Sequence, residues 1–150
     1  MGSTATFTPV PAGCVSEVRE DPGMAERDFG DMTVDVDKAW HGIHYLLTGS
    51  DYDGEEPLSL VILGGESLND EGTRILTPEV VQQVAAVLPM EEVLRAKYDP
   101  DEMDRMEIYP TIWGAEGDEG CDYLLDNYTN LAALYREAAE RGDAIVTTIS

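Results

Sequence analysis

Two histidines, His41 and His44, are the side chains in this sequence best suited to acid–base chemistry near neutral pH. They lie three positions apart, which makes them neighbours on the surface of a helix. A metal site would need at least one more ligand, and no His-Glu-x-x-His pattern supplies one. Asp37 stands four positions before His41 and could orient it or favour its charged form. The competing structural interpretation pairs His41 with Asp37 on the helix surface and partly buries His44 beside Trp40.

The segment 107–113, Glu-Ile-Tyr-Pro-Thr-Ile-Trp, is the second place where residue types suggest a site. Two aromatic residues around a proline can line a pocket or a protein-binding groove. They can equally be core residues, because aromatic side chains are mostly buried. Together with the histidine pair, this segment defines the candidate ligand-binding residues, which are Trp40, His41, His44, Tyr109 and Trp113.

Two further motifs are weaker. The acidic run 51–56 gathers oxygen ligands as calcium loops do, but it lacks the spacing and closing glutamate of an EF-hand, so a solvated turn is favoured. Gly64-Gly65 follows an apolar run, yet no phosphate-loop pattern is present and Glu66 would repel an anion. The sequence predicts neither a metal site nor a cofactor, and no catalytic residues can be assigned.

Charge is the strongest compositional feature. Thirty-one Asp and Glu face nine Lys and Arg, for a formal net charge of −22. Such a surface repels phosphates, so nucleic acid and anionic membrane are disfavoured as partners. It would attract a basic protein, although the same charge could serve only to keep the protein soluble.

The elements that must position these residues follow from apolar spacing. Helical periodicity predicts helices at about 35–47, 78–88 and 120–141. Alternation and β-branching predict strands at 4–10 and near 144–149, which could pair with each other. Proline, glycine and polar residues predict loops at 20–31 and 66–74, and an extended segment at 108–113. The expected fold class is α+β, with helices packed around a small sheet.

The length, the apolar runs and the cysteines predict the number of domains, the cellular compartment and the state of the thiols. The 150 residues fit one domain, 1–150. No apolar run is long enough for a membrane helix, and the first residues do not resemble a secretory signal, so we expect a cytoplasmic protein. Cys14 and Cys121 lie 107 positions apart, so we expect two thiols there.

Several segments form an ordered set, which is Asp37–Gly49, Pro57–Leu68, Leu76–Glu79, Glu107–Pro110 with Trp113, and Tyr123–Gly142. This ordered set resembles the YfbM-like family of small bacterial proteins. The resemblance covers about residues 33–149 and implies a compact α+β domain of unknown function. It implies no catalytic residues.

Two functional hypotheses follow. The first is a non-enzymatic acidic binding or regulatory protein that engages a basic protein partner, because the chain carries strong charge without a catalytic constellation. The alternative is a small enzyme or ligand-binding domain, with a pocket near Trp40, His41, His44, Tyr109 and Trp113.

Overall fold

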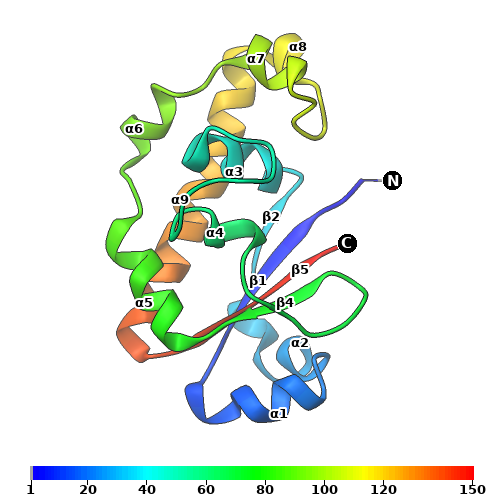
Figure 1. Cartoon of the computed structure of the whole chain (residues 1–150), viewed down its shortest axis with the longest axis vertical. Helices are drawn as coiled ribbons and strands as arrows, with labels where there is room; N and C mark the ends of the chain where they lie inside the picture. The colour runs from blue at the N-terminus through cyan, green and yellow to red at the C-terminus, as the bar shows by residue number, and fades with distance from the viewer. Residues whose placement is uncertain (1) are drawn as a thin grey trace.

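The computed structural model describes residues 2–150, which fold around a five-stranded sheet in the order β2-β1-β5-β4-β3 (Figure 1). Every neighbouring pair is antiparallel. The terminal strands pair along their whole length, from Ala5 opposite Ile149 to Val10 opposite Ala144, which confirms the predicted pairing. The strands are β1 Ala5–Val10, β2 Val34–Asp37, β3 Glu66–Ser67, β4 Thr73–Leu76 and β5 Ala144–Ile149.

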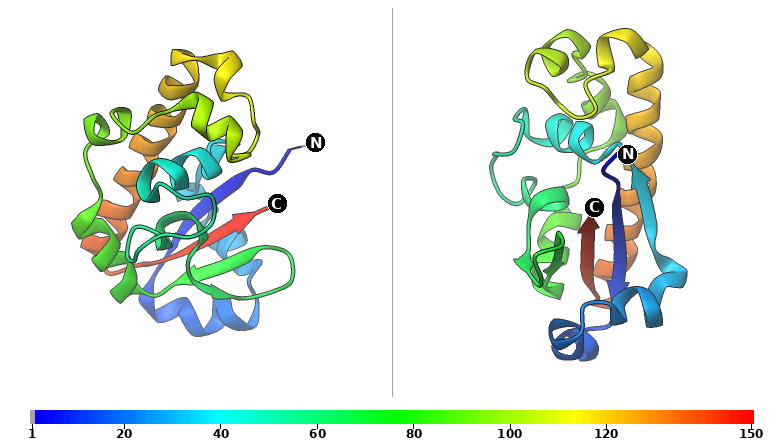
Figure 2. Two further views of the ribbon diagram at one scale, coloured as in Figure 1. Left: turned by 45° about the horizontal axis from the view of Figure 1, so that its top comes forward. Right: turned by 90° about the vertical axis from the view of Figure 1, so that its right-hand side faces the viewer.

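Helices cover the sheet on both faces, because successive strand residues point to opposite sides. Ile145 and Leu76 belong to the larger apolar core, whereas Val146 and Ile75 belong to a smaller one. The larger core lies under α3, α5 and α9, and the smaller one under α1 and α2. Figure 2 shows the backbone of these helices and of the sheet in two further views. The helices are α1 Val15–Glu20, α2 Met24–Phe29, α3 Trp40–Thr48, α4 Leu60–Leu63, α5 Pro78–Val87, α6 Glu91–Arg95, α7 Pro100–Arg105, α8 Trp113–Glu116 and α9 Asp118–Arg141, with 3-10 turns at Ala12–Cys14 and Gly30–Met32.

The long helices confirm the α+β prediction. The predicted helix at 120–141 is α9, which ends at Gly142 in the left-handed conformation. The predicted helix at 78–88 is α5, which begins at Pro78. Trp40 is 7% exposed and Leu131 is fully buried, so the apolar stripes of α3 and α9 face the core as predicted.

Helix α3 begins later than the sequence predicts. Residues 34–37 form strand β2, not the first turn of a helix, because Val36 points into the core while its two aspartate neighbours face solvent. That alternation has the period of a strand. The helix starts only at Trp40 and ends at Gly49, which is left-handed (φ 76°), as expected of a glycine stop.

Three segments predicted as irregular contain regular structure or turns. The predicted loop 20–31 holds α2, which buries Ala25 under the sheet. The predicted loop 66–74 holds β3 and the start of β4, because backbone pairing with Thr147 and Thr148 fixes residues 73–74 in the sheet. The predicted extended segment 108–113 is a turn that leads into α8. Local composition misses these elements because tertiary contacts hold them.

Helices α3 and α9 approach closely at Gly42. A Cβ atom placed there would lie 2.6 Å from Cδ2 of Leu124, which is fully buried. Glycine at this position therefore lets the helix that carries both histidines pack directly against the longest helix of the molecule.

Within the described residues, none of the helices combines the length and apolar character needed to cross a membrane.

Candidate functional site

Both histidines are fully buried and hold the acidic loop that follows α3. The Nε2 atom of His41 lies 2.8 Å from the carbonyl oxygen of Asp51, and that of His44 lies 2.8 Å from the carbonyl oxygen of Asp53. The expected surface ion pair between His41 and Asp37 is wrong, because the imidazole turns inward to the loop. The histidines anchor the loop 51–56 through two of its backbone carbonyl oxygens.

The hydrogen bonds of His41 define its tautomer. Its Nδ1 atom accepts a hydrogen bond from the backbone N–H of Tyr109 at 2.8 Å, so the ring proton sits on Nε2 and is donated to Asp51. His44 likewise donates from Nε2, while its buried Nδ1 has no partner among the described residues. Burial lowers the pKa of both imidazoles, and the carbonyl bonds only partly oppose this effect. Both rings are therefore neutral at physiological pH.

A column of aromatic rings surrounds His41. Trp40 stacks on His41 with ring centroids 5.1 Å apart and on Tyr109 at 5.6 Å, while Tyr52 covers His41 at 4.7 Å. Trp40 also donates from its indole nitrogen to the carbonyl oxygen of Ser3. The column joins the segment before β1, α3, the acidic loop and the turn after α7.

Of the five residues predicted as one ligand site, the structure brings Trp40, His41 and Tyr109 together in the aromatic column. His44 is fully buried and bonds the acidic loop. Trp113 is fully buried and donates from its indole nitrogen to the carbonyl oxygen of Ile108. It closes the floor of one cavity, whereas Trp40 lines another.

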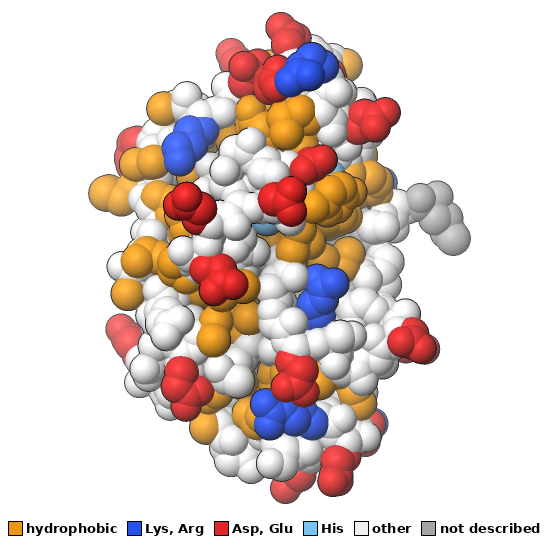
Figure 3. Space-filling view, in the orientation of Figure 1, with side chains coloured by type: hydrophobic (Ala, Val, Ile, Leu, Met, Phe, Trp, Pro, Cys, Tyr) orange, Lys and Arg blue, Asp and Glu red, His pale blue; other side chains and the backbone are white. Residues whose placement is uncertain are grey.

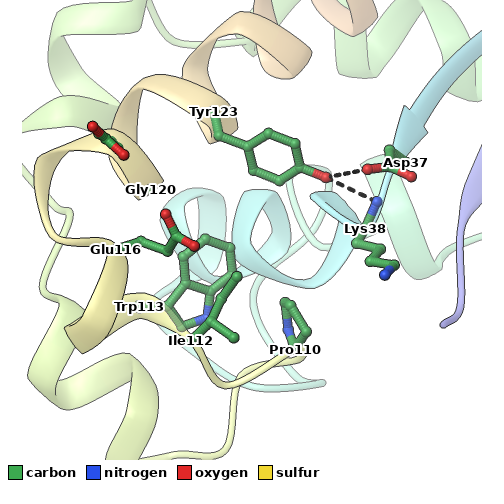
Figure 4. A pocket seen from close by; sticks show the side chains of 9 residues that line it. Asp37, Lys38, Pro110, Ile112, Trp113, Glu116, Gly120 and Tyr123 are labelled. Atoms are coloured by element: carbon green, nitrogen blue, oxygen red, sulfur yellow. Dashed lines mark hydrogen bonds between the residues drawn. The ribbon is translucent and has the colours of Figure 1, made fainter. Parts of the chain in front are cut away.

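The cavity above Trp113, which we call the acidic pocket, has a volume of about 330 Å³ and lies between the end of β2, α8 and the start of α9 (Figure 4). Its apolar surface includes Pro110 and Ile112, the latter 40% exposed. The full lining is Asp37, Lys38, Pro110, Ile112, Trp113, Glu116, Glu119, Gly120 and Tyr123.

A tyrosine positions the carboxylate at one side of this pocket. The hydroxyl of Tyr123 donates to Oδ2 of Asp37 at 2.7 Å and accepts from the backbone N–H of Lys38 at 3.0 Å (Figure 4). Burial and the hydrogen bond to Asp37 both raise the pKa of Tyr123 far above its ordinary value. The phenol therefore stays protonated and holds Asp37 in place.

The backbone around the pocket is strained at two non-glycine positions. Asp37 has φ 55°, and Thr111, which stands between two lining residues, has φ 62°. The left-handed region is unusual for any side chain and an outlier for a β-branched one. Such conformations persist where surrounding structure imposes them and cluster at functional sites.

The carboxylates of the acidic pocket have no basic partner among the described residues. Within residues 2–150, six ion pairs are found, and none includes Asp37, Glu116 or Glu119. All three side chains belong to exposed residues, and the described lining holds a single basic residue, Lys38. The pocket is therefore net negative. The wider surface is similar, with more acidic than basic groups on the face drawn in Figure 3.

Sequence reasoning missed most of this pocket. It treated Asp37 only as a partner for His41, and it assigned no role to Glu116, Glu119 or Tyr123. One signal was available, because Glu119 and Tyr123 stand four apart and share a face at the start of the longest helix. The convergence with Asp37 depends on the tertiary structure. No group of three or more side chains suited to hold a metal ion occurs in the described part of the chain.

Comparisons with known proteins place this fold in a family. Residues 1–148 match the model of a family described as a domain of unknown function, DUF1877. The chain is 32% identical over 127 residues to Protein YfbM of Escherichia coli (strain K12). This match covers 77% of this chain and 75% of that protein. It also resembles the crystal structure of YfbM from Escherichia coli, described as a protein of unknown function, with TM-score 0.72 over 98% of this chain and 99% of that chain, at 24% identity. The resemblance to YfbM is thus confirmed, and the chain belongs to the DUF1877 family of domains of unknown function.

Proposed function

We propose that this protein is a non-enzymatic binding protein whose acidic pocket takes up a basic side chain of a protein partner. One observation carries the proposal: three carboxylates without basic partners in the described chain surround a small apolar cavity. An arginine or lysine side chain has the complementary form, with an apolar stem and a cationic end. A cavity of about 330 Å³ is large enough for one such side chain.

The apolar surface and the carboxylates of the pocket would bind different parts of the partner's side chain. Pro110 and Ile112 offer apolar surface for the stem of the bound side chain. Asp37 is fixed by Tyr123, so its carboxylate would lose little freedom on binding the cationic end. An arginine is favoured over a lysine because its planar guanidinium can reach two carboxylates with separate N–H groups.

The protonated phenol in the pocket argues against acid–base catalysis there. A catalytic base needs a pKa near the working pH, and the pKa of Tyr123 is shifted upward, away from neutrality. The hydroxyl is also occupied by Asp37 and by the backbone of Lys38. This arrangement suits positioning of a carboxylate better than transfer of a proton.

The family relationship and the net charge bear on where this interaction would occur and how it would respond to salt. We place the protein in the bacterial cytoplasm, where Cys14 and Cys121 would remain thiols. Long-range attraction between a surface of charge −22 and a basic partner would speed their encounter, and added salt would slow it.

A labelled peptide with three arginines separated by glycine and serine provides a direct test. Binding is measured by fluorescence anisotropy with the parent protein and with the double variant Glu116→Gln/Glu119→Gln. Removing two exposed charges from the pocket should weaken binding by about threefold to tenfold.

The matched control is the double variant Glu137→Gln/Glu140→Gln. It removes the same charge at the same spacing, from the far end of α9, outside the acidic pocket. This control should change the dissociation constant by less than about twofold. Equal weakening by the two double variants would show a diffuse charge effect and would rule out the pocket as the binding site.

A further inference from the structure

A second cavity contains a basic residue, Arg74, that forms no ion pair within residues 2–150. This cavity, which we call the Arg74 cleft, has a volume of about 420 Å³ and is lined by Trp40, Tyr52, Leu63, Gly72, Arg74 and Ile149. Arg74 is the one charged residue in this described lining. Its neighbours are aromatic or aliphatic side chains and a glycine, so the cleft differs from the acidic pocket in both charge and composition.

Arg74 is available to bind an anion. Five of the seven arginines, Arg19, Arg27, Arg95, Arg105 and Arg141, form ion pairs with carboxylates, and Arg74 forms none within residues 2–150. Its Nη1 atom donates to the carbonyl oxygen of Leu63 at 2.6 Å, which fixes the guanidinium plane. No hydrogen bond from Nε or Nη2 is found in the described part of the chain. These two N–H groups form the edge that binds a carboxylate through two parallel hydrogen bonds.

The aromatic wall of the Arg74 cleft is held in place. Tyr52 is 61% exposed, yet its ring lies on His41 with centroids 4.7 Å apart. His41 in turn stacks on Trp40 and hydrogen-bonds the backbone of Asp51, next to Tyr52. An exposed ring with such support can take part in binding without a large loss of entropy.

The backbone at the other side of the cleft excludes larger side chains. Gly72 has φ 87°, which side chains rarely adopt, and a Cβ atom there would clash with the carbonyl oxygen of Ile149. Glycine at this position therefore lets the turn before β4 lie directly against the backbone of Ile149. Ile149 and Leu63 supply the remaining apolar surface.

We propose that the Arg74 cleft binds a small aromatic carboxylate. The free edge of the guanidinium would bind the carboxylate, and the aromatic body would lie against Tyr52 and the part of Trp40 that lines the cleft. A monoanion with an apolar body is favoured over phosphate, because one arginine faces a protein of net charge −22 and a dianion would meet twice the repulsion. This site shares no lining residue with the acidic pocket and does not depend on the function proposed for it.

Phenylacetate is the probe, with phenylacetamide as its uncharged analogue. Binding is followed by NMR through the two indole N–H signals, which distinguish the cavities because Trp40 lines the Arg74 cleft and Trp113 lines the acidic pocket. Phenylacetate should move the Trp40 signal in a saturable manner and leave the Trp113 signal in place. Phenylacetamide should bind at least about tenfold more weakly, because it cannot form the charge-assisted pair.

Two variants separate the roles of charge and aromatic surface. Arg74→Gln should weaken phenylacetate binding by about tenfold to a hundredfold, and Arg74→Lys, which keeps the charge without the planar fork, should give an intermediate loss. Tyr52→Ser changes an exposed side chain and should keep the fold, so it provides a second test if Arg74→Gln proves unstable. It should weaken phenylacetate binding by about threefold or more. Unchanged affinity in both Arg74→Gln and Tyr52→Ser would overturn the proposal. So would an absence of binding to the parent protein, a shift confined to Trp113, or equally tight binding of inorganic phosphate.

Discussion

The Nδ1 atom of His41 accepts a hydrogen bond from the backbone N–H of Tyr109, 2.8 Å away and 68 positions further along the chain. The opposite nitrogen of the same ring donates to the carbonyl oxygen of Asp51. One buried imidazole thus joins α3, the acidic loop and the turn before α8. That turn also carries Pro110 and Ile112 of the acidic pocket, so the bond from Tyr109 to His41 helps to hold the backbone of the pocket lining in place.

Replacing His41 should destabilise the fold more than replacing His44. His41→Ala leaves the N–H of Tyr109 and the carbonyl oxygen of Asp51 without partners and opens a cavity, a loss of about 2–4 kcal/mol. His44→Ala removes one hydrogen bond and also the unpartnered Nδ1, so its cost should be smaller. Urea denaturation at neutral pH measures both. A cost below about 1 kcal/mol for His41→Ala would contradict this structural role.

Stability should depend on the histidines as the pH falls. Burial lowers the pKa of both imidazoles in the folded state, so the unfolded chain binds protons first. The stabilising contribution of the neutral rings is therefore complete above the unfolded pKa of about 6.5 and is progressively lost as the pH drops below that value. The measurement is the free energy of unfolding at about pH 7.5 and about pH 5.5.

The acidic surface requires a control for this experiment, because protonating its carboxylates relieves repulsion and acts in the opposite direction. The double variant His41→Gln/His44→Gln keeps the carboxylates and removes both titrating rings. The parent should lose more stability than this variant between the two pH values. Identical pH dependence in the two proteins would show that the histidines do not contribute.

Gly42→Ala should destabilise the protein even though alanine is the better helix former by about 1 kcal/mol. The new methyl group would lie 2.6 Å from Cδ2 of the buried Leu124 and force the two helices apart. We expect a net loss of about 1–3 kcal/mol. Gly30→Ala is the matched control, because Gly30 has φ −64° and a methyl group there would meet no described atom within 4 Å. Thermal denaturation should show no loss of stability for it.

The core face of α9 provides two further substitutions. Leu131 is fully buried, so Leu131→Ala should cost about 2–5 kcal/mol. Tyr135 donates its hydroxyl to the carbonyl oxygen of Val61 at 2.6 Å, and Tyr135→Phe would leave that buried oxygen unsatisfied, at a cost of about 1–3 kcal/mol. Denaturant titration gives both values. Neutral behaviour of Leu131→Ala would mean that the helix presents a different face to the core.

Elements with strong local signals could be predicted from the sequence. The stripe through Leu131 and Tyr135 has helical spacing over several turns, and Gly142 marks the end of α9. The terminal strand at 144–149 is rich in β-branched residues, which favour strands.

Features that depend on distant contacts could not be predicted. Strand β4 begins in a polar segment and is held by pairing with β5, about 70 positions away. The inward orientation of His41 depends on Tyr109 and Asp51, which a helical wheel does not include. The acidic pocket likewise joins Asp37 to residues of α8 and α9, so its carboxylates appear in the sequence as separate surface charges.

The central claim is that the acidic pocket binds a basic side chain, and NMR mapping tests it most directly. The probe is a blocked, otherwise neutral peptide with a single arginine, and its counterpart carries uncharged citrulline in the same position. The arginine peptide should shift the backbone amide signals of Ile112, Gly120 and Tyr123 most strongly, and the citrulline peptide should leave them nearly unchanged. Shifts spread over acidic residues outside the pocket, or equal shifts with the two peptides, would contradict the claim.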